Sequence, residues 1–367
     1  MSVIHIGWNG DIGGAERAVH QLAVNQHAGG RRRVALGFGQ ARGWYCDLAR
    51  SQGVPVVDFG MGGGCDVLAA IRARRALRAF DIHHFHAAEP LLMLASTSCR
   101  SAVRVYTHRA GVVDYHGRSA VRYRLIGALV RRFDAVTGTA QAAAAVERWL
   151  DMPASRVVRT FNGVDFDRLD ADAEISRDEL RAQHGVPPDA VLIGTAANLR
   201  RWKRIDWLIE AAGRLHSDNW RIWIIGDGED RDRLQQLADR SDVRERIQFH
   251  GMQSAIGSWL RALDVFVLPS GPEESFGNAV IEAMACGVAP IVSRDCPAHV
   301  DHVADGRTGL VVDDPAQLAK RLDELIDSAP RRARLGSAAK RFVREKYPIE
   351  AMVDRFELLY DRLEARP

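Results

Sequence analysis

The sequence predicts an α/β protein with two doubly wound domains that face each other across a cleft. The chain has 367 residues, which is enough for two domains of ordinary size. Its composition, 47% hydrophobic and 26% charged, is that of a globular protein and excludes a disordered or fibrous chain. Short β-branched segments alternate with longer helical patterns, which is typical of βαβ units and a parallel sheet.

In the first half, short apolar segments are expected to form one sheet, with helices between them. The helices include residues 15–26 and 121–132. The expected strands are residues 3–6, 34–36, 54–58, 82–85, 103–106 and 135–137.

A second series of strand segments starts near residue 191 and predicts a second sheet of the same kind. The acidic, turn-rich stretch between the two series is expected to hold the linker, so we place the domains at 1–170 and 171–348. The final helix, within residues 349–367, is predicted to return to the N-terminal domain and complete it. The second-series strands are residues 191–194, 222–225, 247–249, 265–268, 289–292 and 309–312.

The charge of the chain is nearly balanced overall but uneven between its halves. The 50 Lys and Arg against 47 Asp and Glu give a net charge of +3, which does not favour nucleic-acid binding. Residues 1–160 nevertheless hold 21 Arg and 11 acidic residues, a net charge of +10, and the remainder carries −7. Two interpretations stay open: the first half meets an anionic surface or substrate, or its arginines form ordinary solvated faces.

The cysteines and the N-terminal residues bear on the cellular compartment. The 5 cysteines are widely spaced and lack a CxxC pattern, so neither a zinc site nor a disulfide framework is predicted. The first residues do not have a basic segment followed by an apolar one, and no apolar stretch approaches roughly 18 residues. We therefore expect a cytoplasmic protein, at most peripheral to the inner face of the cell membrane.

A glycine-rich loop follows the first expected strand and leads directly into a helix. Its sequence is GWNGDIGGAE over residues 7–16, with Gly13 and Gly14 next to the helix start. Such a loop suits a phosphate, because glycines let the backbone approach an anion and the helix N–H groups carry partial positive charge. A tight turn without a ligand is the structural alternative. The spacing is not GxGxxG, which disfavours a nicotinamide enzyme.

The most informative segment, residues 273–287, has the sequence EESFGNAVIEAMACG and follows an expected strand. The backbone N–H groups at the start of such a helix can hold a diphosphate or sugar hydroxyls. Glu274 lies on the loop and Glu282 lies about two turns into the helix. Carboxylates accept hydrogen bonds from hydroxyls, so this pair can hold two parts of one polyol ligand.

These segments resemble the retaining nucleotide-sugar glycosyltransferases of family 4, which have the GT-B fold. Glu274 and Glu282 match the E-x7-E motif of that family. Further family motifs occur in the same order, so the resemblance covers nearly the whole chain. They are Gly13-Gly14-Ala15-Glu16, Thr107-His108, Asn162-Gly163-Val164-Asp165, Ile225-Gly226-Asp227-Gly228 and Asp305-Gly306-Arg307-Thr308-Gly309.

The resemblance implies metal-independent transfer of a hexose or hexosamine from a nucleotide-diphosphate sugar to an acceptor hydroxyl, with retained configuration. It also implies a role in polysaccharide or glycolipid assembly, a glycan, glycolipid or lipid-linked acceptor, and no cofactor besides the nucleotide sugar. The implied catalytic residues are His108, Lys203 and Glu274, and Glu16, His86 and Arg109 are implied on the acceptor side. The implied donor-binding residues are Gly13, Gly14, Arg200, Lys203, Gly251, Met252, Glu274, Phe276, Gly277, Asn278 and Glu282.

The sequence departs from the family pattern at one position. The family usually has an arginine five residues before the lysine that binds the diphosphate; these positions are Asn198 and Lys203 here. Either Arg200 or Arg201 can supply the missing charge, and we expect Arg200 to do so.

Other polar and aromatic residues are given structural roles. His84 and His86 share one face of a strand, but no carboxylate or cysteine at ligand spacing completes a metal site, so no metal is expected. His250, His299 and His302 are expected at the surface or in packing, and Trp202 and Trp207 in the core.

Two alternative functions remain open at this stage: a sugar-nucleotide epimerase or phosphorylase of similar architecture, and a non-catalytic two-lobed binding protein.

Two arginine clusters supply much of the positive charge of the first half. We expect them to contact anionic lipid or a lipid-diphosphate-linked glycan, with a solvated face as the alternative. The clusters are Arg72, Arg74, Arg75 and Arg78, and Arg118, Arg122, Arg124, Arg131 and Arg132, which flank Val121, Leu125, Ile126 and Leu129.

Overall fold

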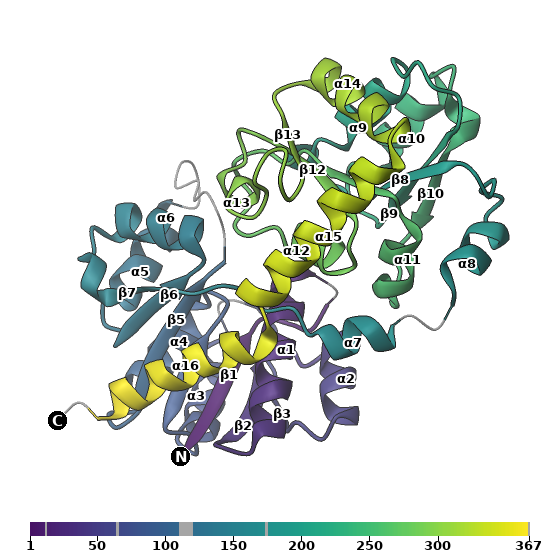
Figure 1. Cartoon of the computed structure of the whole chain (residues 1–367). Coiled ribbons are helices and arrows are strands. Elements are labelled where there is room, and N and C mark those ends of the chain that lie inside the picture. The colour runs from purple at the N-terminus through teal and green to yellow at the C-terminus, as the bar shows by residue number, and fades with distance from the viewer. Residues whose placement is uncertain (12, 64–65, 110–119, 173–174, 366–367) are drawn as a thin grey trace. The chain divides into compact units, whose positions relative to one another are not determined.

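A computed structural model describes the chain except for residues 12, 64–65, 110–119, 173–174 and 366–367. Cys65 and Arg118 therefore lie outside the described residues. The chain divides into unit 1, Met1–Gly163 with Ile349–Pro367, and unit 2, Val164–Pro348 (Figure 1). The domain boundary expected after residue 170 falls inside helix α7 (Phe166–Ala171), which belongs to unit 2.

Unit 1 contains a seven-stranded parallel sheet of order β3-β2-β1-β4-β5-β6-β7. Every expected strand segment corresponds to one of its strands, but β3 begins at Val56, so residues 54–55 of the expected segment 54–58 precede it. The edge strand β7 was not expected, because its sequence is only VVR and carries no distinct apolar pattern. The strands are β1 (Ser2–Gly7), β2 (Arg33–Phe38), β3 (Val56–Asp58), β4 (Ile82–Phe85), β5 (Val103–His108), β6 (Ala135–Gly138) and β7 (Val157–Arg159).

Helices cover both faces of this sheet. Along β1, Val3 packs into one apolar core and Ile4 into the other, as alternation in a strand requires. The first core is formed with α1 (Gly14–Gly29), α2 (Trp44–Ser51) and α16 (Ile349–Glu364). The second is formed with α3 (Val67–Leu77), α4 (Pro90–Thr97), α5 (Ala120–Val130) and α6 (Ala140–Leu150), and the short 3-10 helix η1 (Ala154–Arg156) precedes β7.

The C-terminal helix α16 belongs to unit 1, as the sequence predicts. Its buried residues Met352, Phe356 and Tyr360 recur every four positions and form one apolar face. Helix α16 lies along β1 and α1 in Figure 1, and in sequence it is the last segment that contributes to the first core.

Unit 2 contains a six-stranded parallel sheet of order β10-β9-β8-β11-β12-β13, and the second strand series is confirmed. The strands are β8 (Val191–Ala196), β9 (Trp220–Ile225), β10 (Ile247–Gly251), β11 (Val265–Leu268), β12 (Ala289–Ser293) and β13 (Leu310–Val312). The remaining helices are α8 (Arg177–Gln183), η2 (Arg201–Lys203), α9 (Ile205–Ala212), α10 (Arg231–Asp239), η3 (Arg244–Arg246), α11 (Ile256–Ala262), α12 (Asn278–Ala285), α13 (Pro297–Val300), α14 (Pro315–Ile326) and α15 (Ala329–Lys346).

Each sheet has one point at which the strand order reverses, between β1 and β4 in unit 1 and between β8 and β11 in unit 2. Loops that leave neighbouring strands there go to opposite faces, and ligands of doubly wound proteins bind at the carboxyl ends of these strands. The loops after these strands are therefore the places to look for a site. Among the described residues, no helix combines the length and apolar character needed to cross a membrane.

Candidate functional site

In unit 2, the loops that follow β8 and β11 meet at the switch point. The Gly271 N–H donates to the Trp202 carbonyl at 2.7 Å. Lys203 Nζ lies 2.5 Å from Glu274 Oε2, and the two side chains are only 12% and 11% exposed. Two of the three residues predicted to be catalytic are thus joined by an ion pair that is largely shielded from water.

Glu274 is held in its charged form. Burial by itself would raise the pKa of this carboxyl, but Lys203 and His299 outweigh burial and hold the pKa well below its ordinary value. His299 Nε2 lies 3.7 Å from the same carboxylate oxygen as Lys203. Glu274 is therefore a hydrogen-bond acceptor at any physiological pH and does not supply a proton.

The start of helix α12 is shaped by a glycine. Gly277 is its N-cap residue, has φ of +85°, and provides no side-chain cap. A Cβ at this position would lie 2.5 Å from the His299 ring, so the close approach of the ring requires glycine. Residue 277 therefore adds no side chain at the start of the helix, where backbone N–H groups can bind an anion.

His302 supports the loop that precedes α12. Its Nε2 donates to the Phe276 carbonyl at 2.7 Å, and its Nδ1 accepts from the Tyr347 hydroxyl at 2.9 Å. Burial lowers the pKa of His302 to about 3, so the ring is neutral. His299 and His302 are both buried in packing, and the sequence analysis did not foresee that they adjoin Glu274 and Phe276.

The three arginines that follow β8 differ in their partners. Arg204 forms a bidentate ion pair with Asp295, with contacts of 2.8 and 2.7 Å, and Arg201 lies 3.9 Å from Asp230. Arg200 is exposed and has no ion pair in the described part of the chain. Asn198, at the departure from the family pattern, is exposed as well.

The other residues predicted to bind the donor in unit 2 lie at the end of β10 and on α12. Gly251, with φ of +65°, ends β10, and its carbonyl accepts from the Gly226 N–H at 2.7 Å. Met252 follows it and is exposed. Asn278 begins α12, and Glu282 lies on the same helix with a buried side chain.

The tryptophans of this region are not core residues, contrary to expectation. Trp202 and Trp207 are only partly buried. Each has a cation over its ring: the Lys203 ammonium lies 4.2 Å from the Trp202 centroid, and the Arg204 guanidinium lies 5.0 Å from that of Trp207. The Trp202 ring therefore helps to fix the position of Lys203.

In unit 1, the three residues predicted on the acceptor side come together. Arg109 Nη2 donates to His86 Nδ1 at 3.0 Å, and Nη1 donates to Asn162 Oδ1 at 3.4 Å. Burial lowers the pKa of Arg109 to about 10, and the carboxylate of Glu16 opposes this shift. Glu16 Oε2 would lie 2.2 Å from a Cβ at position 13, so Gly13 leaves the space that this carboxylate occupies.

His108 ends β5 next to Arg109. Its Nδ1 lies 3.3 Å from the Tyr106 hydroxyl, and its ring centroid is 6.2 Å from that of Trp149. Burial lowers the pKa of His108 to about 4, so the imidazole is neutral. Its Nε2 is buried and has no hydrogen-bond partner among the described residues, which leaves one ring nitrogen for a ligand.

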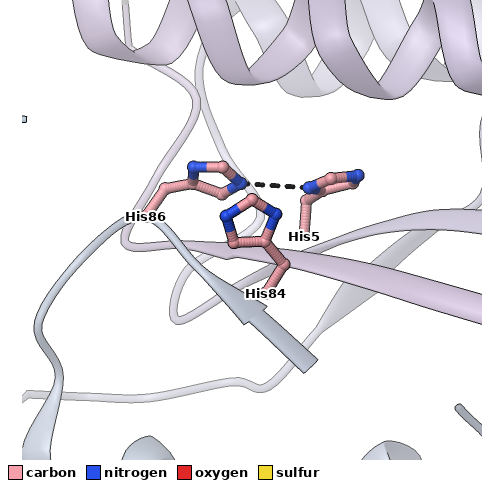
Figure 2. A group of neighbouring side chains, drawn as sticks. All are labelled: His5, His84 and His86. Atoms are coloured by element: carbon pink, nitrogen blue, oxygen red, sulfur yellow. Dashed lines mark hydrogen bonds between the residues drawn. The ribbon is translucent and has the colours of Figure 1, made fainter. Parts of the chain in front are cut away.

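A third histidine joins His84 and His86 (Figure 2). His5, on the neighbouring strand β1, pairs in register with His84, and potential ligand atoms of the three lie within 4.8 Å of one another. Sequence analysis did not include His5, because the pairing of β1 with β4 joins residues far apart in the chain. The cluster can hold a metal only if ring nitrogens give up hydrogen bonds: both nitrogens of His84 bond at 2.6 Å, to the Tyr360 hydroxyl and Thr107 Oγ1.

Residues 176–342 match the family model of glycosyl transferases group 1. The matched segment lies wholly within unit 2 and includes both Lys203 and Glu274. Unit 2 carries a group 1 glycosyltransferase domain. The family resemblance drawn from the sequence is confirmed at this coarser level.

Two curated relatives match this chain over segments of different length. The chain is 32% identical over 178 residues to the lipopolysaccharide core biosynthesis glycosyltransferase LpsE of Rhizobium meliloti, which is 48% of this chain and 51% of the relative. It is 25% identical over 289 residues to the N-acetyl-alpha-D-glucosaminyl L-malate synthase of Bacillus anthracis, covering 76% and 74%. The chain spans about half the length of the lipopolysaccharide core relatives it matches.

A solved structure shares the fold of both units, and so extends beyond the group 1 domain of unit 2. The structure of Anabaena HepE in complex with UDP-glucose is similar to this chain with a TM-score of 0.87 and 20% sequence identity. The similarity covers 99% of this chain and 100% of the HepE chain. The predicted GT-B architecture of two Rossmann-like units is confirmed.

Proposed function

We propose that this chain is a retaining glycosyltransferase that moves a hexose or hexosamine from a nucleotide-diphosphate sugar to an acceptor hydroxyl. The observation that carries the proposal is the shielded Lys203–Glu274 ion pair at the switch point of the group 1 domain. HepE has been solved with UDP-glucose, which supports a nucleotide sugar as the donor class. The names of LpsE and the malate synthase support transfer of a sugar to a glycan or small-molecule acceptor.

In this proposal Glu274 accepts hydrogen bonds from the hydroxyls of the donor sugar. Its charge is secured by Lys203 and His299, so it needs no proton loss on binding. Lys203 has three N–H donors, of which Glu274 takes one, so the same ammonium can also hold a diphosphate oxygen. The remaining donor contacts are assigned to Gly13, Gly14, Arg200, Gly251, Met252, Phe276, Gly277, Asn278 and Glu282.

The reaction breaks the bond between the anomeric carbon and the diphosphate and forms a bond to the acceptor oxygen. The acceptor proton passes to the departing phosphate oxygen, on the same face as the attack, so that configuration is retained. Lys203 and Arg200 stabilise the charge that develops on the leaving group, without a metal ion. His108 contacts the donor sugar through its Nε2, and Glu16, His86 and Arg109 face the acceptor.

The test is a transfer assay with a panel of nucleotide sugars, preceded by thermal stabilisation to identify the donor. A bound ligand at 100 times its Kd stabilises the protein by about 2.7 kcal/mol, which is readily measured. We expect transfer by the wild-type chain, loss in Glu274→Gln and Lys203→Ala, and little change in Arg201→Ala. Release of nucleotide without glycosyl transfer would favour an epimerase or phosphorylase, and binding without turnover a two-lobed binding protein.

We also propose that unit 1 contacts an anionic lipid surface through α3, α4 and α5. Helix α4 packs against both neighbours, and none of the three helices contains an acidic residue. Their exposed face combines large apolar side chains with arginines, which suits an interface between water and anionic headgroups. The exposed apolar residues are Val67, Leu68, Ile71, Leu94, Val121 and Leu125, and the exposed arginines are Arg72, Arg74, Arg75, Arg78, Arg122, Arg124, Arg131 and Arg132.

The apolar residues that the sequence analysis places among the arginines of α5 are divided between the core and the surface. Ile126 and Leu129 are buried in the core of unit 1, whereas Val121 and Leu125 are exposed. Arg122 is on the exposed side and lies 3.3 Å from Glu89. The exposed apolar residues of α5 are therefore not needed for the core, which supports a role at a surface.

A further inference from the structure

A line of hydrogen-bonded polar side chains crosses unit 1 from the strand ends to the C-terminal helix. Arg109 Nη2 donates to His86 Nδ1 at 3.0 Å, and His86 Nε2 lies 3.0 Å from His5 Nδ1 (Figure 2). His5 Nε2 lies 2.7 Å from Gln26 Oε1, and Gln26 Nε2 donates to Glu357 Oε1 at 2.5 Å. Five side chains thus form one continuous chain of hydrogen bonds: two directly follow β5 and β4, and the others lie on β1, α1 and α16.

The two ends of this chain fix the direction of every hydrogen bond in it. A guanidinium only donates, so His86 Nδ1 is the acceptor and its proton lies on Nε2. That proton is donated to His5 Nδ1, which places the His5 proton on Nε2, facing Gln26 Oε1. A carboxylate only accepts, so Glu357 takes the amide proton of Gln26. Reversal of a single bond would leave two donors or two acceptors facing each other.

Both histidines of the chain are neutral rings. Burial lowers the pKa of His5 to about 4 and holds that of His86 well below its ordinary value. The positive charge of Arg109 acts in the same direction on both. A divalent ion between the rings would replace the hydrogen bond from His86 to His5 and would lie close to this guanidinium. The geometry therefore favours the hydrogen-bonded chain over a metal site.

The far end of the chain is firmly anchored. Arg32 Nε donates to Glu357 Oε2 at 2.6 Å, and both side chains are only 4% exposed. Arg32 also forms ion pairs with Asp361 and with Glu364, the latter at 2.8 Å. Glu357 is thus tied to α16 by the backbone and to the start of β2 by Arg32, so the position of its Oε1 is well defined.

The near end of the chain keeps donors for a ligand. Arg109 Nε is buried and has no hydrogen-bond partner among the described residues, and only one hydrogen bond of each Nη atom is taken by His86 or Asn162. The guanidinium is held by Asn162 and, at the shorter distance, by His86, whose own orientation depends on the rest of the hydrogen-bonded chain. The direction of the remaining N–H groups therefore depends on residues distant from Arg109.

We propose that Gln26 and Glu357 are positioning residues, which through His5 and His86 orient the Arg109 guanidinium toward an oxygen of the acceptor. This inference rests on the proposed function, in which Arg109 faces the acceptor. Neither Gln26 nor Glu357 touches substrate. Their effect is on the geometry of a binding residue at the other end of the chain.

The test exchanges the amide of Gln26 and the carboxylate of Glu357, which form the hydrogen bond between α1 and α16. In Gln26→Glu, two carboxylates face each other, repel and lose the inner hydrogen bond, so the chain is broken. In the double variant Gln26→Glu with Glu357→Gln, residue 26 accepts from His5 and from the new amide, whose oxygen accepts from Arg32. Every donor then again faces an acceptor. Glu364→Gln is the matched control, because it removes another carboxylate partner of Arg32 on α16 and leaves the chain intact.

We expect Gln26→Glu to raise the acceptor KM at least about tenfold while the donor KM stays constant, since a small misplacement of a binding group costs this much or more. The double variant should regain most of the loss, and Glu364→Gln should behave as wild type. Acceptor KM values that are the same in Gln26→Glu and in wild type would overturn the proposal. So would equal impairment of the single and double variants.

A second readout does not depend on activity. In the full chain with ¹⁵N-labelled histidine and arginine, NMR should show His5 and His86 as neutral rings protonated at Nε2. The Arg109 Nε–H signal should shift in Gln26→Glu and return in the double variant. Uptake of one Zn²⁺ with loss of the His86 Nε2–H signal, or an Arg109 signal that does not move, would overturn the inference. Absence of transfer by the wild-type chain would instead reject the proposed function.

Discussion

The His299 ring approaches Gly277 so closely that a Cβ on residue 277 would lie only 2.5 Å from it. Because Gly277 also has φ of +85°, Gly277→Ala combines backbone strain with a clash. We expect the free energy of unfolding to fall by about 1–3 kcal/mol and donor affinity to fall with it. Urea denaturation and nucleotide titration measure the two effects. Gly306→Ala is the control, since φ there is +72° but a Cβ would meet no atom within 4 Å.

Glu274 and Lys203 should affect different kinetic steps. Glu274→Gln keeps the size of the side chain but removes the charge, and we expect kcat to fall on the order of 10²-fold if the contact tightens in the transition state. Lys203→Ala should lower kcat and raise the donor KM together, because it removes the ammonium that is proposed to hold the donor diphosphate and to stabilise it as the leaving group. Steady-state kinetics with the identified donor separates the two. Wild-type kcat in Glu274→Gln would reject its assignment.

The arginines after β8 make a direct comparison. Arg200→Ala should impair transfer, since this guanidinium is exposed and without an ion pair among the described residues, whereas Arg201→Ala should not. The measurement is kcat/KM for the donor in both variants. An equal loss in Arg201→Ala would mean that Arg201, at present 3.9 Å from Asp230, supplies the charge missing at Asn198.

Stability should fall in mildly acidic solution. Burial lowers the pKa of His5, His83, His108 and His250 to about 4, and an unfolded chain has histidines of ordinary pKa, about 6.5. Between these values the unfolded chain binds more protons than the folded one, so the stabilisation is complete above pH 6.5 and is lost as pH falls toward 4. Each histidine contributes up to about 1.4 kcal/mol per pKa unit. Thermal unfolding from pH 7.5 to 4.5 should show the decline; a constant Tm would contradict it.

Vesicle binding tests the surface of α3, α4 and α5. We expect the protein to sediment with vesicles that contain phosphatidylglycerol at low salt, because each arginine near the anionic surface contributes about 1 kcal/mol. Less protein should sediment at high salt, because salt screens this attraction. Leu68→Asn with Leu125→Asn should weaken binding, and Leu358→Asn, an exposed position on α16, should not. Failure to bind anionic vesicles at low salt would leave an ordinary solvated face.

Local pattern predicted the strands and the principal loops well, because buried parallel strands such as Val265–Leu268 are continuous apolar runs and glycines mark the turns after them. It did not predict His5 or His299 as site residues. Each is brought to its neighbours by strand pairing or loop packing between segments far apart in sequence. The short β7 and the division of the apolar residues of α5 between core and surface were missed for a similar reason: neighbouring elements decide which apolar side chains are covered.

Unit 1 is discontinuous in the chain, whereas unit 2 is the single segment Val164–Pro348. During synthesis, residues 1–163 leave the ribosome first, yet their sheet lacks Met352, Phe356 and Tyr360 on one face until α16 has emerged. Unit 2 can therefore finish folding while unit 1 still exposes part of its core. A stop codon just before Ile349 would remove none of unit 2, but it would leave a nascent unit 1 with an uncovered apolar face, a target for chaperones and proteases.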